Sequence, residues 1–258
     1  MTGLITRVRG WHTNNGALPS LYVSAEEKTL ARLPGLKFWL DPQARFESLG
    51  SRLGIRDRKG RLDSTLNSPG APYTLGGVIN GQPTVTFTNA TLQGLKYASA
   101  TSLNFMAGGY TVVAVAKRTG ITGNFKFFEL YNNILSVFTG TDLRIYVMHN
   151  AVSSNTSAVV LDGGAHIIQA AWNPVTGLST VQIDGVVKAM FSGAKAAPDL
   201  SGVTTFSVGT GSGVVNGQTA DMGHVMIFDR DLTAVENTST RSSMLTALGA
   251  KYGIAVTL

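Results

Sequence analysis

Short apolar segments, separated by turns rich in glycine and asparagine, recur along this chain from residue 36 to residue 228. Residues 110–117 (YTVVAVAK) are apolar on both alternating faces, which is typical of a strand in the middle of a sandwich. Asp184-Gly185 joins two such segments as a two-residue hairpin turn would. This spacing favours an all-β fold made of two antiparallel sheets. The expected strands are residues 36–40, 84–88, 110–117, 125–130, 134–139, 143–148, 166–172, 178–183, 186–191, 204–208 and 221–228.

The first 33 residues show no sustained hydrophobic period, so we interpret residues 1–33 as an N-terminal extension that docks on a partner. Within it, Ser24 followed by Glu27 is a capping-box pattern, which predicts a short helix running to about Arg32. Residues 34–258 then form the predicted sandwich. Inside that unit, residues 50–82 are rich in glycine and proline with few apolar runs, and we expect them to form a long loop.

A helix is also expected at the C-terminal end. Thr233 and Glu236 have the spacing of a capping box at its start. Gly253 is well suited to end it, because glycine adopts the left-handed conformation that follows many helices. The buried face of this helix is expected to carry Met244, Leu245, Leu248 and Tyr252.

Positive charge is concentrated at the front of the chain. The protein has 258 residues, no cysteine and a formal net charge of +6. Residues 1–61 contain eleven Lys and Arg against five Asp and Glu, so the whole excess lies there. Such asymmetry points to an acidic partner surface, although a solvated basic loop would look the same. The candidate docking residues are Arg7, Arg9, Arg52, Arg56, Arg58, Lys59 and Arg61.

Five segments together resemble the laminin-G-like, concanavalin A-like lectin/glucanase family: LKFWLDPQ (36–43), RDRKG (56–60), INGQPTVTF (79–87), AAWNPVTGLSTVQIDGVVKA (170–189) and GHVMIFDRDLTAVENTSTRSSMLTALGAKYGI (223–254). The resemblance implies a jelly-roll sandwich whose first strand lies beside its last, with Trp39 near Ile227. It also implies a structural role for Arg230, bonding backbone in the closing turn. Residues 1–33 have no counterpart in it.

The pattern of carboxylates argues against catalysis. Glucanases of this fold place a Glu-x-Asp-x-x-Glu set on one strand face, and no glutamate here has an acidic partner two or four residues away on a strand. Asp229 and Asp231 are two residues apart, but they fit a turn before the helix better than a catalytic pair. His166 and His224 are expected to be satisfied strand residues rather than metal ligands. The sequence therefore predicts no catalytic residues and no enzyme.

Ligand sites are less defined. No cofactor is expected, but calcium stays open, since lectin-like modules bind it through oxygen ligands that Asp142, Asp162, Asp221 and Asn216 could supply. A sugar site needs exposed aromatic side chains beside polar groups. The candidates are Trp11, Tyr73, Tyr97 and Tyr131, whereas Trp39 and Trp172 are expected in the core.

Three functions follow, in order of preference. The first is a non-enzymatic structural protein of a tailed-phage virion, such as a capsid decoration, head fibre or tail component. It would be made in the host cytoplasm, because MTGLITRVRG lacks the apolar stretch of a signal peptide and no 18-residue apolar run exists. Its partners would be acidic virion proteins and further copies of itself, with a host surface glycan also open. The second is a carbohydrate-binding module or adhesin domain, and the third is a divergent glycoside hydrolase.

Overall fold

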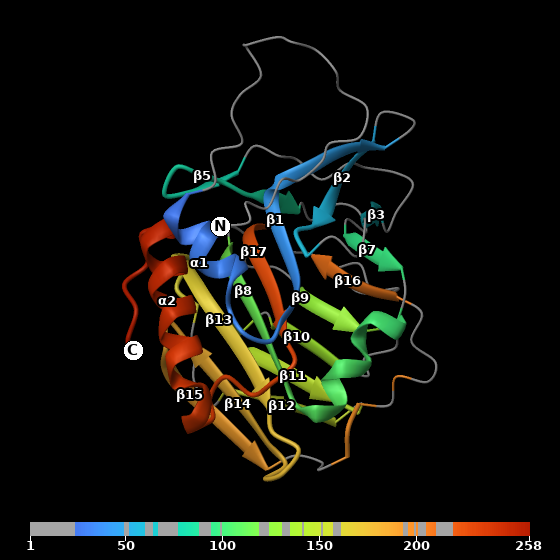
Figure 1. The fold of residues 1–258 in the computed structure, drawn as a ribbon, viewed down its shortest axis with the longest axis vertical. Coiled ribbons are helices and arrows are strands. Elements are labelled where there is room, and N and C mark those ends of the chain that lie inside the picture. The colour runs from blue at the N-terminus through green and yellow to red at the C-terminus, as the bar shows by residue number, and fades with distance from the viewer. Residues whose placement is uncertain are drawn as a thin grey trace, which may run out of the picture.

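A computed structural model describes residues 24–48, 52–59, 64–66, 77–87, 94–98, 100–118, 124–130, 135–140, 142–150, 152–156, 161–192, 196–198, 200, 205–209 and 219–258. In this part of the chain, strands make up two large antiparallel sheets and a small hairpin, accompanied by two α-helices (Figure 1). No helix in these ranges has the length and apolar character needed to cross a bilayer.

The first sheet contains the opening and closing strands side by side. Its order is β15-β14-β13-β8-β17-β1-β2, with β6 also paired to β17. Strand β1 pairs with β17, so the expected adjacency of first and last strands is confirmed; Trp39 lies opposite Met226, one residue from the expected Ile227. The members are β1 (Leu36–Ser48), β2 (Arg52–Asp57), β6 (Val85–Phe87), β8 (Tyr110–Arg118), β13 (Ala165–Trp172), β14 (Leu178–Ile183), β15 (Val186–Ser192) and β17 (Ala220–Phe228).

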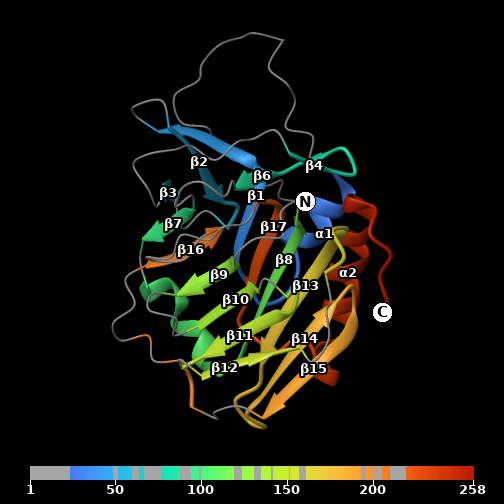
Figure 2. The ribbon, with the colours of Figure 1, turned by 180° about the vertical axis from the view of Figure 1, so that it is seen from behind.

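The second sheet faces the first across the main core. Its order is β12-β11-β10-β9-β16-β7-β3, and several of its strands are seen in a row in Figure 2. The members are β3 (Ser64–Leu66), β7 (Leu95–Ala98), β9 (Phe125–Leu130), β10 (Leu135–Thr139), β11 (Ile145–His149), β12 (Val152–Asn155) and β16 (Thr205–Gly209). A hairpin of β4 (Val78–Ile79) and β5 (Gln82–Pro83) and a 3₁₀ helix η1 (Ala100–Gly108) complete the described strand region.

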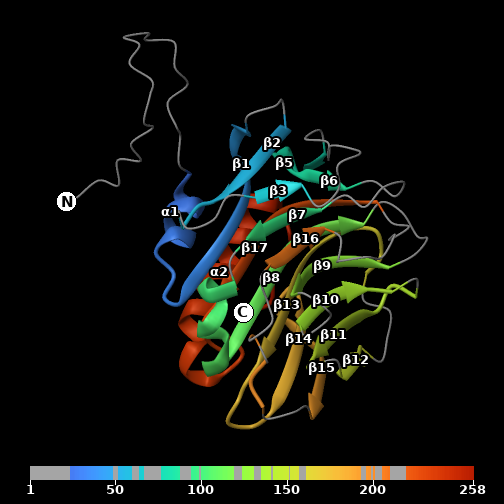
Figure 3. The ribbon, with the colours of Figure 1, turned by 90° about the vertical axis from the view of Figure 1, so that its right-hand side faces the viewer.

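The alternation of side chains along β8 explains why the protein has three layers, which are the second sheet, the first sheet and the two helices. Val112 and Ala114 point into the core between the sheets, whereas Val113 and Val115 point to the opposite face of the first sheet. That opposite face is covered by α1 (Ala25–Ala31) and α2 (Thr238–Tyr252), which lie on one side of the sandwich in Figure 3. Trp172 is buried between the sheets and Trp39 beneath the helices, so both are core residues as expected.

The N-terminal helix is part of this packing. Ser24 caps it, since the Glu27 N–H donates to Ser24 Oγ at 3.2 Å. Leu30 and Leu33 join the cluster of buried residues that α2 forms with the first sheet. Residues 24–33 therefore pack on the sandwich, whereas the sequence pattern predicts them to be part of the extension. Residues 1–23 lie outside the described residues, and a docking role for them stays a prediction.

Two local expectations were wrong. Residues 50–82 are not one long loop, because β2, β3 and β4 lie within them and short strands need few apolar residues when they pair at a sheet edge. The expected capping box at Thr233 and Glu236 does not open α2. A 3₁₀ turn η3 (Val235–Asn237) comes first, and Thr233 instead donates both N–H and Oγ–H to Asp231 Oδ1. Gly253 does end α2 in the left-handed conformation, with φ 64°.

Candidate functional site

A buried cluster of charges joins α1, α2 and the first sheet. Glu27 is 2% exposed and accepts from Lys251 Nζ at 2.5 Å. Arg58 donates to Glu27 Oε2 at 3.2 Å and lies 2.5 Å from Asp41 Oδ2. Its guanidinium also sits 4.9 Å from the centre of the Trp39 ring. This cluster of Glu27, Lys251, Arg58 and Asp41 fixes both helices to the sheet.

Arg58 is thus engaged inside the protein rather than held out toward a partner. Lys59, next to it, is exposed, and its Nζ reaches the Ala31 carbonyl at 3.5 Å. Arg52 and Arg56 belong to β2, but their side chains lie outside the described residues, as do Arg7, Arg9 and Arg61. The structure brings only Arg58 and Lys59 of the candidate docking residues into view, so docking stays a prediction for the others.

His224 borders the charge cluster and was expected to be hydrogen-bonded. It is 1% exposed, and neither ring nitrogen has a hydrogen-bond partner in the described part of the chain, so that expectation was wrong. Its ring meets Trp39 and Tyr252 edge to face. Burial lowers the pKa of His224 to about 4, although Asp41, with Oδ1 3.7 Å from Nδ1, acts in the opposite direction. The imidazole is therefore neutral at pH 7.

The acidic pair in the closing turn has structural partners. Asp229 forms an ion pair with Lys37 at 2.9 Å, and Asp231 accepts from the Asn173 amide at 3.1 Å as well as from Thr233. The Arg230 Nε–H donates to the Asp229 carboxylate at 2.9 Å, where the resemblance implied a backbone contact. These bonds agree with our assignment of Asp229 and Asp231 to a turn.

Each candidate calcium ligand that the structure describes contacts a different side chain. Asp142 accepts from Tyr146, Asp162 contacts His166, and Asp221 accepts from Thr86. Asn216 lies outside the described residues. Across the ranges that the structure covers, no group of three or more His, Cys, Asp or Glu side chains could hold a metal ion. A calcium site stays a prediction, because the three candidate ligands that the structure describes are each bound to another side chain.

The outer face of the second sheet is polar, unlike the face that α2 covers. Along one row across the strands lie Lys96, Ser207, Glu129, Ser136 and Met148, which occupy paired positions. Glu129 is 2% exposed and forms an ion pair with Lys126 on the same strand. The adjacent row holds Lys126, Phe138 and Tyr146. Polar and aromatic side chains therefore share this face.

Phe138 and Tyr146 form a partly exposed aromatic platform on β10 and β11. Their rings stack with centroids 5.0 Å apart and planes 14° apart. The Tyr146 hydroxyl donates to Asp142 Oδ2 at 2.9 Å, and Arg144 Nε lies 3.5 Å from the same oxygen. The Asp142 and Arg144 side chains are each 40% exposed. We call Phe138, Tyr146, Asp142 and Arg144 the aromatic platform.

Such a platform has the parts of a sugar site. A ring face attracts the C–H groups of a pyranose, and a carboxylate beside a guanidinium offers an acceptor and a fork of donors for hydroxyl groups. Burial opposes ionisation of Asp142, but hydrogen bonds from Tyr146 and the Arg144 N–H, with the Arg144 charge, outweigh it and lower the Asp142 pKa. Asp142 is therefore a carboxylate acceptor at neutral pH.

The sequence did not single out these aromatics as ligand residues. Of the residues named for sugar contact, Tyr97 is fully buried, and Trp11, Tyr73 and Tyr131 lie outside the described residues. Phe138 and Tyr146 occupy the outward positions of predicted strands, and the alternation of both strands was the signal that could have found them.

Comparisons with known proteins support the fold. No protein-family model matches the chain, and no curated protein matches it. Among solved structures, Trypanosoma rangeli sialidase is similar with a TM-score of 0.57 at 15% identity, over 84% of this chain and 33% of that one. A mutant of that sialidase displaying trans-sialidase activity gives 0.60 at 16% identity, over 90% and 38%.

A second kind of protein shares the same fold. The binding domain of botulinum neurotoxin DC, in complex with rat synaptotagmin II, gives a TM-score of 0.56 at 11% identity, over 81% of this chain and 52% of that one. This chain thus spans about a third to a half of the structures it matches. At such identities the likeness shows a shared β-sandwich, which confirms the predicted fold class.

Proposed function

We propose that this chain is a non-enzymatic, lectin-like binding module that holds a glycan on its aromatic platform. The observation that carries the proposal is the stacked Phe138–Tyr146 pair, partly exposed beside the Asp142 and Arg144 side chains. Similar folds include a sialidase in complex with sialic acid and a toxin binding domain in complex with SialylT, which adds weight to a sugar ligand.

The partners of the carboxylates support a role without catalysis. A general acid or nucleophile must be free to meet the reacting atoms. Here Glu27, Asp41 and Glu129 are buried in ion pairs with lysine or arginine. Asp229 and Asp231 are bound in the closing turn. This arrangement suits binding rather than hydrolysis.

We place the module in a tailed-phage virion, as a capsid decoration, head fibre or tail component. The support is the jelly-roll resemblance together with the net charge of +6, all of it within residues 1–61. The basic front of the chain would meet an acidic virion surface, and the sandwich would remain outside to bind host glycan. Multiple copies in one particle would compensate for a weak single site.

A glycan array with the full chain tests binding and catalysis together. We expect a defined subset of glycans to be retained, and those glycans to be recovered unchanged by mass spectrometry after prolonged incubation. Shortened or rearranged glycans would overturn the non-enzymatic assignment and favour a divergent glycoside hydrolase. Absence of binding at high protein concentration would overturn the glycan ligand.

The virion placement has a separate test, and the packing of α1 decides which deletion it should use. Deleting residues 1–33 would remove Leu30 and Glu27 from the core, so loss of assembly could reflect unfolding. Deleting residues 1–23 removes Arg7 and Arg9 but leaves α1. We expect this truncated chain to melt as a folded sandwich and to be absent from purified particles by mass spectrometry. Full incorporation of the truncated chain would contradict docking through this segment.

Replacing Tyr146 by alanine is expected to weaken binding of an array-positive glycan by at least tenfold, because the ring face and the hydroxyl bound to Asp142 are both lost. Tyr146→Phe keeps the ring and should retain most of the affinity. Titration calorimetry with the same glycan compares the two variants.

A further inference from the structure

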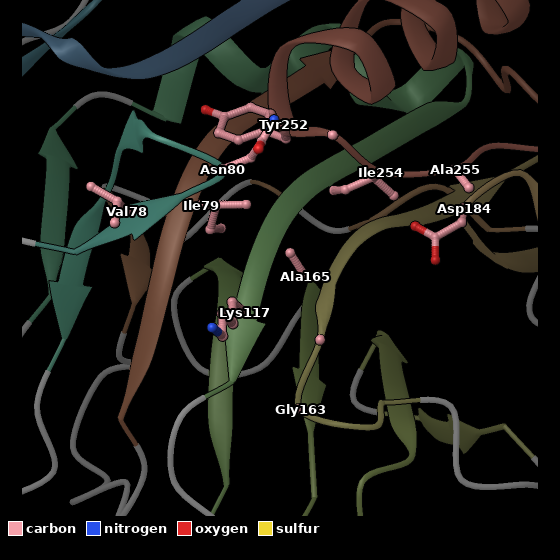
Figure 4. A pocket seen from close by; sticks show the side chains of 12 residues that line it. Val78, Ile79, Asn80, Lys117, Gly163, Ala165, Asp184, Tyr252, Ile254 and Ala255 are labelled. Atoms are coloured by element: carbon pink, nitrogen blue, oxygen red, sulfur yellow. The ribbon is translucent and has the colours of Figure 1, made fainter.

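A pocket of about 410 Å³ lies on the other side of the molecule, at the end of the first sheet that α2 leaves uncovered. Its walls are the β4–β5 hairpin, the end of β8, the start of β13 and the residues that follow α2 (Figure 4). The volume is at the lower end of the ~300–1,000 Å³ of small-molecule sites, which suits one ring better than a chain of sugars. The aromatic platform is on the opposite sheet, so the two sites are distinct.

The walls of this pocket are held in place by the backbone. Asn80 and Gly81 turn the hairpin with φ 48° and 72°, and the Asn80 amide lies against Gly253, where a β-carbon would come within 2.5 Å of it. The Ile254 N–H donates to the Gly249 carbonyl at 3.0 Å. The Thr257 N–H donates to the Asp184 carbonyl at 2.9 Å. These contacts shape the walls of the pocket.

Lys117 supplies an available positive charge in this pocket. It follows Val113 and Val115 on the outer face of β8, and in the described part of the chain its ammonium has no hydrogen-bond or ion-pair partner. Asp221 lies across from it on β17, but that carboxylate accepts from the Thr86 hydroxyl at 2.5 Å. Lys117 and Asp221 therefore form no ion pair in the described part of the chain, and the Lys117 ammonium remains open to a ligand.

The acidic residue of the same pocket, Asp184, is bound to a histidine. Asp184 Oδ2 lies 2.7 Å from His166 Nδ1, and its Oδ1 accepts from the Ile167 N–H at 2.7 Å. His166 Nε2 lies 3.0 Å from Asp162 Oδ1. Two carboxylates on the two ring nitrogens favour the doubly protonated imidazolium, and the hydrogen bond to Asp184 raises the pKa of His166 most. The Asp184 carboxylate is therefore bound to His166 and the Ile167 N–H rather than to Lys117.

We propose that this pocket binds a single carboxylated pyranose, such as a uronic acid, with its carboxylate on Lys117. Asn80 offers an amide for hydroxyl groups, and Ile79, Ala165 and Ile254 offer an apolar wall for the C–H face of the ring. The proposal rests on the proposed function in that the ligand is a sugar, and it adds a preference for acidic sugars at a second site.

Titration of the full chain with glucuronate and, in parallel, with glucose tests this proposal by NMR. The two ligands share a ring and differ in charge. We expect glucuronate to bind at least tenfold more tightly than glucose, and Lys117→Gln to remove that difference. Lys188→Gln, on the exposed edge strand β15, is the matched control and should keep it. Thermal melts check that all variants fold.

Equal affinity for the two ligands, no binding of either, or a glucuronate preference that survives Lys117→Gln would overturn the pocket. A different result would overturn the aromatic platform as a glycan site. In that case, Tyr146→Ala would leave binding of the array-positive glycan unchanged. Tyr146→Ala is expected to leave glucuronate binding at the pocket intact.

Discussion

Replacing Lys251 by methionine is expected to lower the free energy of unfolding by about 3–5 kcal/mol, the usual cost of removing one partner of a buried ion pair. Lys251 Nζ lies 2.5 Å from Glu27 Oε1, and the two side chains are 5% and 2% exposed. Methionine fills nearly the same volume, so the loss comes from a carboxylate left with Arg58 alone rather than from a cavity. Chemical denaturation measures the change.

Two further variants separate charge from packing. Lys28→Met, on the exposed side of α1, removes the same charge without a buried partner and should change stability by less than about 0.5 kcal/mol. In the double variant Glu27→Gln with Lys251→Met, part of the lost stability should return because residue 27 no longer carries a buried charge that has lost its lysine. A Lys251→Met protein within 1 kcal/mol of the parent would show that the charge cluster does not hold the helices on the sheet.

Acidification is expected to cost the parent protein about 2.5 kcal/mol more than a His224→Phe variant between pH 7 and pH 4.5. The folded-state pKa of His224 is about 4, against 6.5 when unfolded. Since the folded pKa is lowered, the unfolded chain binds more protons in this window. The His224 titration therefore leaves the free energy of unfolding unchanged above pH 6.5. As the pH falls from 6.5 toward 4, it lowers the free energy of unfolding by about 1.4 kcal/mol per pH unit.

The choice of phenylalanine keeps an aromatic ring against Trp39 and Tyr252 while removing the titration. Denaturation midpoints at several pH values, converted with a common slope, give the comparison. The NMR resonances of the His224 ring report its pKa in the parent protein independently. We expect them to titrate with a midpoint near pH 4. Parallel stability curves for parent and variant, or a midpoint near 6.5, would contradict a neutral, dehydrated His224.

Alternation along single strands was enough to predict most of the sandwich. Residues 110–117 have two apolar faces because β8 separates two cores, and Asp184-Gly185 turns as a hairpin with both residues at positive φ. The short strands at the sheet edges, such as β3 with three residues, were missed because they are too brief to show a period.

The candidate sites depended on contacts that sequence spacing does not encode. Arg58 stands in a basic run that suggests an exposed patch, yet its partners Glu27 and Asp41 come from α1 and β1. The stacked pair Phe138–Tyr146 forms only when β10 and β11 pair in register. The pocket of Lys117 needs the residues after α2 to return to the start of β13. Long-range pairing thus decides which polar residues face solvent.

The most direct measurement of the central claim is the affinity of the best array-positive glycan for the parent chain, Tyr146→Phe and Tyr146→Ala by titration calorimetry. A lectin-like module that uses the aromatic platform should bind with nearly equal affinity in the first two and at least tenfold more weakly in the third, with the glycan recovered intact. Equal affinity in all three proteins, or conversion of the glycan to product, would contradict the account.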